Sequence, residues 1–433
     1  MSNSIAVQQK RFIQLAPSNN SSSGYGPIGS QPIIRFSVAD TQALALLKDA
    51  RLNATITVTK DGGTGVALTD DINIDPVLGM CSVMDQVIVS SRRFGTQIEQ
   101  VVNLGRLESA YYRSRYSPKM MASHAYHETK AVGLGRYNRW AGTTVASSQT
   151  TDIRAVASRK SITSSQEISL PFHVGMFLTD SPTDLSAVGG LELAVYLQKP
   201  EAMFFGTDAA SMNYTLTNVS LTVPLLYKSA EMIAQTPPES VIEFLNWTSM
   251  YSVLDSTQSS IAQRLYLTGL VAGIHNSLPT KQLNSYSANQ FGLKSIGVER
   301  LTFLRDGQRA PLEKTMIVQD DRVTTRSVED QSTTYPEVLR EYLSAWGPVR
   351  ELKYSQVIPE LVKGIADRSG VVGIGCNFSP EASGVNISGV LSIDVQSRLQ
   401  DSADSSLIQP YALFSFYLSR QAFVASPAGL KAL

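Results

Sequence analysis

An alternation of apolar and polar residues near the C-terminus constrains the fold more than any other feature. Five apolar residues share one face of an extended chain there: Val385, Ile387, Leu391, Ile393 and Val395. Four polar residues share the opposite face: Asn386, Ser388, Ser392 and Asp394. A period of two predicts a half-buried strand in an antiparallel sheet.

The same pattern predicts strands along most of the chain. In the first half they are expected at residues 32–38, 54–59, 85–90, 168–172, 191–197 and 214–227. In the second half they are expected at residues 260–267, 298–304, 371–378, 385–395 and 411–423. Helical spacing is found at 98–112 and 335–346, and Pro237-Pro238 predicts the start of another short helix, over Val241–Leu245. Tight turns are expected at Asp61-Gly62-Gly63 and at Asp306-Gly307.

The order of predicted elements is similar in the two halves of the chain. A length of 433 residues is too great for one ordinary β-sandwich and suits two. We therefore predict an all-β fold of two tandem, eight-stranded antiparallel jelly rolls with a few short helices in loops. The expected divisions are a flexible, Ser- and Asn-rich arm (1–30), a first jelly roll (31–228), a linker with a short helix (229–250), and a second jelly roll with the C-terminal tail (251–433).

Charge and cysteine usage limit the classes of function. Lys+Arg and Asp+Glu both number 37, so the chain has no bulk positive field for coating nucleic acid. A charged fraction of 17% fits a surface that neighbouring subunits cover, although an ordinary neutral soluble protein is the alternative. Cys81 and Cys376 lie in apolar runs, which predicts buried free thiols rather than a disulfide bond. No apolar run approaches the ~20 residues needed to cross a bilayer, and no signal-peptide core is present, so a reducing compartment is expected.

Two motifs resemble functional sites but lack essential parts. His124 and His127 with Glu128 would need a third ligand to hold a metal ion, and their order differs from the metalloprotease motif. An exposed loop or subunit contact is the favoured interpretation. Gly373 and Gly375 form G-x-G without the third glycine or the helix of a dinucleotide site, so tight strand packing is favoured.

The remaining candidates also favour structural roles. His173 and His275 lie in apolar segments and are interpreted as core histidines. The basic stretch 113–160 could face a genome or lipid, but an ordinary surface or a source of intersubunit salt bridges is favoured. With four histidines, no G-x-S-x-G elbow and no phosphate loop, the sequence nominates no catalytic, cofactor-binding or metal-binding residue. We predict that the protein is not an enzyme and uses no cofactor.

Three blocks of sequence, in order along the chain, resemble the double jelly-roll major capsid proteins of DNA viruses, with Polinton-like viruses, virophages and adintovirus-type elements as the nearest lineage. The first includes Gly95-Thr96-Gln97-Ile98-Glu99, similar to the family pattern G-x-x-[IL]-E. The blocks together cover about a quarter of the chain: 79–89 with 95–103, then 170–177 with 189–197 and 214–221, then 384–395 with 414–421. Residues 113–165 and 279–297 show no family pattern.

The resemblance implies a structural virion protein that self-assembles. Two jelly rolls per chain give six per homotrimer, so the capsomer is pseudo-hexagonal and tiles an icosahedral shell of a dsDNA virus, assembled in the host cell. Its expected partners are neighbouring capsomers, penton and minor capsid proteins, and an inner membrane or genome that the N-terminal arm could reach. No small-molecule substrate is expected.

Two alternatives stay open at the level of sequence. The first is a minor capsid or spike-like virion protein on the same fold. The second is a carbohydrate-binding or glycoside-cleaving β-sandwich, which needs clustered exposed aromatic residues. Trp140, Trp247 and Trp346 are scattered in the sequence and show no such cluster.

Overall fold

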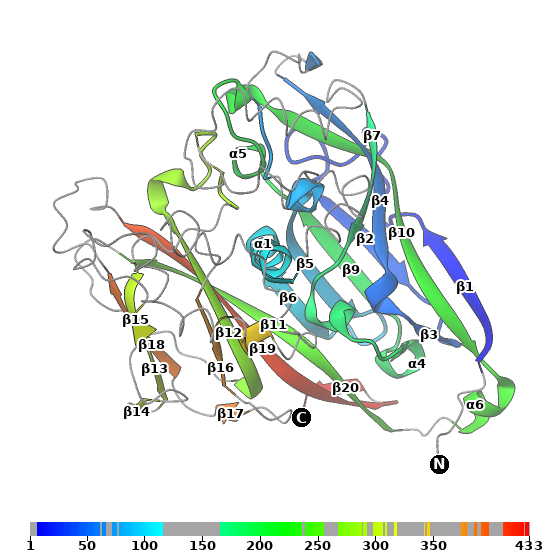
Figure 1. Cartoon of the computed structure of the whole chain (residues 1–433). Helices are drawn as coiled ribbons and strands as arrows, with labels where there is room; N and C mark the ends of the chain where they lie inside the picture. The colour runs from blue at the N-terminus through cyan, green and yellow to red at the C-terminus, as the bar shows by residue number, and fades with distance from the viewer. Residues whose placement is uncertain are drawn as a thin grey trace.

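The computed structural model places the strands in two β-sandwiches that lie side by side (Figure 1). The structure describes the following residues: 7–60, 63–65, 72–75, 78–115, 165–235, 239–254, 267–287, 289–291, 298–305, 308–309, 316–317, 342, 344–346, 374–378, 385–387, 391–397, 410–427 and 429–432.

Two sheets build the first sandwich. The outer sheet has the order β7-β4-β10-β3-β8, with β1 also paired to β10. Its strands are β1 (Val7–Leu15), β3 (Ala43–Ala45), β4 (Arg51–Thr59), β7 (Gln166–Pro171), β8 (Thr183–Asp184) and β10 (Asn213–Lys228). The facing strands run in the order β6-β5-β9-β2 and are β2 (Ile33–Val38), β5 (Met84–Ser91), β6 (Gln97–Val102) and β9 (Leu191–Leu197).

The second sandwich is built in the same way from later strands. Its larger part has the order β16-β12-β19-β11, with β17 beside β12 and β20 beside β19. These strands are β11 (Ser240–Leu254), β12 (Leu267–Pro279), β16 (Ile374–Asn377), β17 (Val385–Ile387), β19 (Tyr411–Ser426) and β20 (Gly429–Ala432). A four-stranded sheet holds β13 (Val298–Arg305), β14 (Gln308–Arg309), β15 (Met316–Ile317) and β18 (Leu391–Ser397).

One sheet runs through both sandwiches. β11 pairs with β6 in parallel at Thr248 and Gln100, and this pairing joins the two sets of strands into a ten-stranded sheet. β11 and β19 pair without a register shift from Ser240 opposite Ala425 to Leu254 opposite Tyr411. The shared sheet makes the two sandwiches one continuous hydrogen-bonded framework.

Alternation of side chains explains the core of the first sandwich. In β4, Leu52, Ala54, Ile56 and Val58 are buried, while the residues between them are half-buried. A single apolar cluster extends from strands such as β4 to Phe416 in β19. Because apolar burial is the main favourable term in folding, this continuous core holds the two sandwiches together as well as each one internally.

Helical segments are short and lie between strands. The longest described one is α1 (Leu104–Arg115), which is drawn between the two sandwiches in Figure 1. The others are η1 (Leu47–Asp49), η3 (Gly79–Val83), η5 (Gly175–Leu178), α4 (Leu185–Val188), α5 (Pro200–Met203), η6 (Ala209–Ser211), α6 (Ala230–Gln235) and η7 (Thr280–Gln282).

Most predicted strands are found, and the predicted all-β class is confirmed. The segments predicted at 32–38, 54–59, 85–90, 168–172, 191–197 and 214–227 correspond to β2, β4, β5, β7, β9 and β10. Those at 298–304, 371–378 and 411–423 correspond to β13, β16 and β19. The strand expected at 260–267 is placed too early, since β12 begins at Leu267 and residues 260–266 lie outside the described part.

The interpretation of residues 1–30 as a flexible arm is wrong for the part that the structure describes. Val7–Leu15 forms β1, which pairs with β10 over most of its length. Ile13 and Leu15 pack against the core, and Tyr25 is buried and bridged to Leu216. The polar composition hid a strand in which Ile13 and Leu15 face the core, while Phe12 lies on the opposite, exposed face. Residues 1–6 lie outside the described part.

Two helix predictions are also corrected. Residues 98–102 of the helix expected at 98–112 belong to β6, and α1 begins at Leu104. The segment after Pro237-Pro238 is β11 rather than a helix, so residues 240–250 belong to a long strand and not to a linker. In both segments, pairing within the ten-stranded sheet outweighs local helical preference. Of the helix expected at 335–346, the described residues 342 and 344–346 are helical.

The alternating segment 385–395 is two strands in two sheets. β17 pairs with β12 of the ten-stranded sheet, whereas β18 pairs with β13 of the four-stranded sheet. Period-two alternation reports which face is buried and carries no signal for a change of sheet. The single strand predicted over 385–395 is therefore wrong: the described residues form two separate strands, and residues 388–390 lie outside the described part.

A first prediction concerns a close backbone contact between the sandwiches, at Gly175. A Cβ atom added there would lie 2.2 Å from the carbonyl oxygen of Leu245 in β11. We expect Gly175→Ala to lower the free energy of unfolding by about 3 kcal/mol or more, because backbone must move. Denaturant unfolding of the two proteins measures this difference.

The matched control is Gly95→Ala. Gly95 has φ +66° and open space around its Cβ position. Its substitution should cost about 1 kcal/mol from backbone strain alone. Equal effects of the two substitutions would contradict the close approach of η5 to β11.

Candidate functional site at the junction of the two sandwiches

A buried carboxylate ties the two sandwiches together. Glu99 of β6 is 2% exposed. Its Oε1 accepts hydrogen bonds from the backbone N–H groups of Gly175 and Trp247, each at 2.8 Å. Its Oε2 accepts one from the N–H of Met176 at 3.1 Å. One side chain thus joins β6 and η5 of the first sandwich to β11 of the second.

Burial of this carboxylate changes its protonation. Loss of hydration raises the pKa of Glu99 to about 7, and the N–H donors of Trp247, Met176 and Gly175 lower it in part. A carboxyl group whose pKa is raised in the folded state stabilises the fold at low pH. That contribution is lost as the pH rises from the unfolded-state pKa of 4.5 through about 7.

Hydrogen bonds and aromatic rings reinforce the junction around Glu99. The N–H of Val102 in β6 donates to Ser249 Oγ of β11 at 2.9 Å. The rings of Trp247 and Trp346 lie 6.0 Å apart, and Tyr111 of α1 lies 5.7 Å from Trp346. Both tryptophans are buried, so this cluster is part of the core.

Residues 104–112 of helix α1 are all buried between the sandwiches. Ser109 Oγ donates to the carbonyl oxygen of Phe291 at 2.8 Å, which joins α1 to a loop of the second sandwich. His173 Nδ1 lies 3.0 Å from Glu108 Oε1, and both side chains are buried. A helix covered all round is expected in the interior of a larger unit, and here it fills the space between two units.

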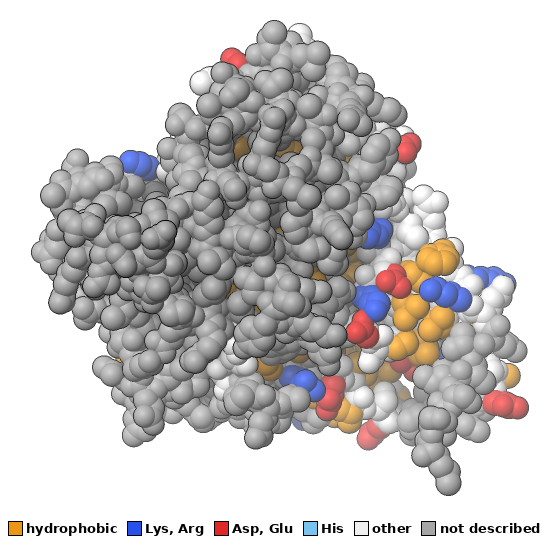
Figure 2. Space-filling view, in the orientation of Figure 1, with side chains coloured by type: hydrophobic (Ala, Val, Ile, Leu, Met, Phe, Trp, Pro, Cys, Tyr) orange, Lys and Arg blue, Asp and Glu red, His pale blue; other side chains and the backbone are white. Residues whose placement is uncertain are grey.

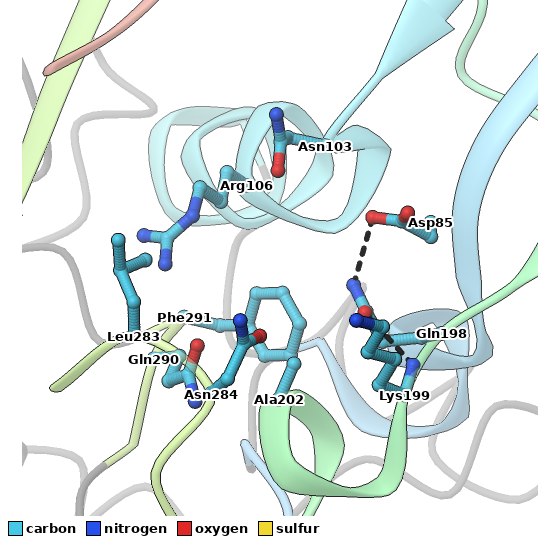
Figure 3. Close-up of a pocket in the computed structure, with 10 residues that line it drawn as sticks. All are labelled: Asp85, Asn103, Arg106, Gln198, Lys199, Ala202, Leu283, Asn284, Gln290 and Phe291. Carbon is cyan, nitrogen blue, oxygen red and sulfur yellow. Dashed lines mark hydrogen bonds between the residues drawn. The ribbon is translucent and has the colours of Figure 1, made fainter. Parts of the chain in front are cut away.

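A cavity of about 180 Å³ lies beside α1 (Figure 3). The first sandwich contributes six of the lining residues: Asp85 of β5, Arg106 of α1, Ala202 of α5, and Asn103, Gln198 and Lys199 from the connecting segments. The second sandwich contributes Leu283, Asn284, Gln290 and Phe291. Asp85 accepts a hydrogen bond from Gln198 Nε2 at 3.0 Å. Burial raises the pKa of Asp85, although Gln198, Arg106 and Lys199 oppose the change.

Arg106 is the most unusual group in the cavity wall. It is 4% exposed, and its guanidinium carbon lies 4.0 Å from the centre of the Phe414 ring. Burial lowers the pKa of Arg106 to about 9, while the charges of Asp85 and Tyr251 raise it. Its Nη1 has no hydrogen-bond partner among the described residues.

Apolar side chains are exposed at several places on the surface. Among the large apolar side chains that the structure describes, the most exposed is Phe12 of β1, at 67%. Others are Ile28, Ile233 of α6, and Val241, Tyr251 and Val253 of β11. Figure 2 shows apolar side chains between basic and acidic ones on the side where β1 and β10 lie in Figure 1. Exposed apolar groups rimmed by charge are typical of contact surfaces.

The residues singled out from sequence have structural positions where the structure describes them. Cys81 and Cys376 are buried free thiols, which confirms that prediction. His275 is buried, its pKa is lowered to about 3 by burial, and its Nδ1 lies 2.9 Å from Ser415 Oγ. A Cβ atom added at Gly375 would lie only 2.9 Å from the Cβ atom of Ala345. The glycine therefore allows tight packing of its strand.

Other candidates lie outside the described residues. These are His124, His127 and Glu128, the basic residues of 113–160 beyond α1, and Trp140. Within the described part of the chain, no group of three or more His, Cys, Asp or Glu could hold a metal ion, and no helix is long and apolar enough to span a membrane.

Sequence reasoning missed the two charged groups of the junction. Glu99 belongs to the G-x-x-[IL]-E block, to which the sequence assigns no role, and the sequence assigns none to Arg106 either. Glu99 lies between Ile98 and Gln100, and Arg106 lies between Gly105 and Leu107, so the local sequence does not mark either side chain as buried. Charged side chains are almost never fully buried unless they are paired, and the burial of these two is visible only in the structure.

Comparison with known proteins addresses the fold. No protein-family model and no curated protein matches the sequence. A cryo-EM structure of the Sputnik virophage matches with a TM-score of 0.56 and 11% identity over 99% of this chain and 88% of that chain. A quasi-atomic model of the PBCV-1 virus capsid matches with a TM-score of 0.54 and 10% identity, over 98% and 96%.

A third structure, PBCV-1 VP54 fitted into a reconstruction of Sputnik, matches with a TM-score of 0.53 and 9% identity, again over 98% and 96%. These structures are double jelly-roll capsid proteins. The fold is a double jelly roll. The predicted fold is confirmed, and the double jelly roll extends over nearly the whole chain.

A second prediction tests the carboxylate that joins the two jelly rolls. Glu99→Gln removes the ionisable group and places an amide N–H₂ where Oε2 accepts from Met176. Between about pH 5 and about pH 8, the free energy of unfolding of the wild type should fall by about 2 to 3 kcal/mol relative to the variant. Urea unfolding across this pH range measures the difference. Parallel pH profiles would show that Glu99 is not a buried titrating group.

Proposed function

We propose that this chain is a viral major capsid protein that assembles as pseudo-hexagonal homotrimers and tiles an icosahedral shell. The observation that carries the proposal is the fusion of two jelly rolls through one ten-stranded sheet. Three such chains around a threefold axis present six similar wedges, and a six-sided block tiles a closed shell with little change of shape.

A rigid junction supports this role. A capsomer can be six-sided only if the two jelly rolls of each chain keep a fixed relative orientation. The Glu99 hydrogen bonds, the buried helix α1 and the Tyr111–Trp346 contact all act across that junction. We infer that function resides in interfaces between chains rather than in a reactive site, and that the protein is located in the virion.

The exposed apolar side chains are the candidate contact surfaces. Phe12 lies on the edge strand β1, where Lys10 Nζ sits 5.2 Å from its ring. Tyr251 and Val253 lie at one end of β11, and Val241 lies at the other. Large permanent interfaces bury such groups, and the low charged fraction of the chain agrees with extensive coverage.

We further propose that the division between the jelly rolls falls between β10 and β11. The first unit then includes β1, and α6 lies in the connection before Ser240. Contacts with a penton, with minor capsid proteins, or with an inner membrane or genome stay predictions. The carbohydrate-binding alternative gains no support from Trp247 and Trp346, which are buried.

A third prediction is the mass of the purified protein in solution. Light scattering after size exclusion should give about three times the chain mass of 47.0 kDa. A stable 47.0 kDa monomer over the accessible concentration range would contradict the homotrimer.

Copy number separates the major capsid role from the alternative of a minor capsid or spike-like protein. In purified particles, a major capsid protein dominates the stained gel and accounts for most of the shell in a cryo-EM map. A minor band located at vertices or protruding from the shell would support the alternative.

A further inference from the structure

A buried arginine lines the cavity at the junction. Arg106 is 4% exposed, and its Nη1 has no hydrogen-bond partner among the described residues. Figure 3 shows the guanidinium group directed toward the part of the cavity near Leu283 and Gln290. Asp85 lies on the other side, where it is engaged by Gln198.

Such an arrangement is energetically unfavourable as it stands. Buried charges are normally paired, because water that is removed from them must be replaced by other partners. The Phe414 ring at 4.0 Å replaces part of the lost hydration on one face of the guanidinium. The N–H groups of Arg106 point outward in the plane of the guanidinium, so the ring stacked on its face accepts no hydrogen bonds from them. Burial lowers the pKa of Arg106, and the charge of Asp85 opposes this change only in part.

The rest of the cavity wall indicates which kind of ligand could accept hydrogen bonds from Arg106. Lys199 adds a second positive charge, and Asn103 and Asn284 add amide groups. Ala202, Leu283 and Phe291 supply apolar wall. A volume of about 180 Å³ is sufficient for a group of a few heavy atoms.

We propose that this cavity binds a small organic carboxylate, whose two oxygens accept hydrogen bonds from the guanidinium of Arg106. Guanidinium and carboxylate match in planar, two-pronged geometry. The carboxylate belongs either to a free small molecule or to the C-terminus of a peptide chain. This site is independent of the proposed capsid role.

Two features favour a carboxylate over phosphate. The negative charge of Asp85 lies in the same cavity and repels a dianion more strongly than a monoanion. The apolar wall of Ala202, Leu283 and Phe291 suits a short hydrocarbon chain and offers no hydrogen bonds to a phosphate. The positive charges of Arg106 and Lys199 oppose binding of a cation.

The location gives binding a structural consequence. Arg106, Asp85 and Lys199 belong to the first jelly roll, whereas Leu283 and Phe291 belong to the second. A ligand that contacts both walls binds the folded, docked arrangement and not the unfolded chain. It therefore raises the unfolding temperature by mass action.

The test is thermal unfolding of the purified full-length protein with sodium butyrate, and with butyramide and sodium phosphate at matched ionic strength. Butyrate at about ten times its Kd should raise Tm by about 2 °C over the butyramide sample, and phosphate should raise it less. A tripeptide with a free C-terminal carboxylate and its amidated form make the second arm. A response to either carboxylate supports the site and identifies the source.

Two variants and one control separate specific binding from a salt effect. Arg106→Met keeps the packing stem, should fold with an unchanged or higher Tm without ligand, and should lose the carboxylate response. Ala202→Leu fills the cavity, leaves Arg106 in place, and should also lose the response. Arg35→Met removes an exposed arginine of β2 and should respond like the wild type.

The proposal is overturned if no carboxylate raises Tm above its neutral analogue. It is equally overturned if Arg106→Met and Ala202→Leu both keep the full response. If Arg106→Met fails to fold, Ala202→Leu decides between these outcomes.

Discussion

The structure depends on one buried carboxylate that accepts backbone hydrogen bonds from both jelly rolls. Glu99 serves Gly175 and Met176 in the first and Trp247 in the second. Those N–H groups would otherwise be buried without acceptors, which costs about 1–3 kcal/mol for each. The parallel pairing of β11 with β6 occurs at the same place, so register, burial and charge together fix how the two units meet.

A continuous sheet and a shared core make the relative orientation of the two jelly rolls part of the fold. Interfaces between domains of one chain commonly allow relative motion of the domains. Here α1 is enclosed between the units, and aromatic rings of both contact one another. A building block for a closed shell needs this property, because small errors in orientation accumulate around the shell.

The fold could be predicted from sequence where a strand has one buried and one half-buried face, as in β4. Prediction failed where pairing decides the outcome. β1 is polar yet completes a sheet edge, residues 98–102 have helical spacing yet pair with β5, and the alternation of 385–395 continues across two sheets. The roles of Glu99 and Arg106 arise from groups more than 70 residues away, which no local pattern encodes.

Amide hydrogen exchange at the junction tests the central claim most directly. The account predicts that the N–H groups of Gly175, Met176 and Trp247 exchange as slowly as those in the middle of β4 and β10, through global unfolding alone. Faster exchange of these three amides, at a rate independent of the two strands, would show that the jelly rolls separate while each remains folded. That result would contradict a rigid double jelly roll held by Glu99.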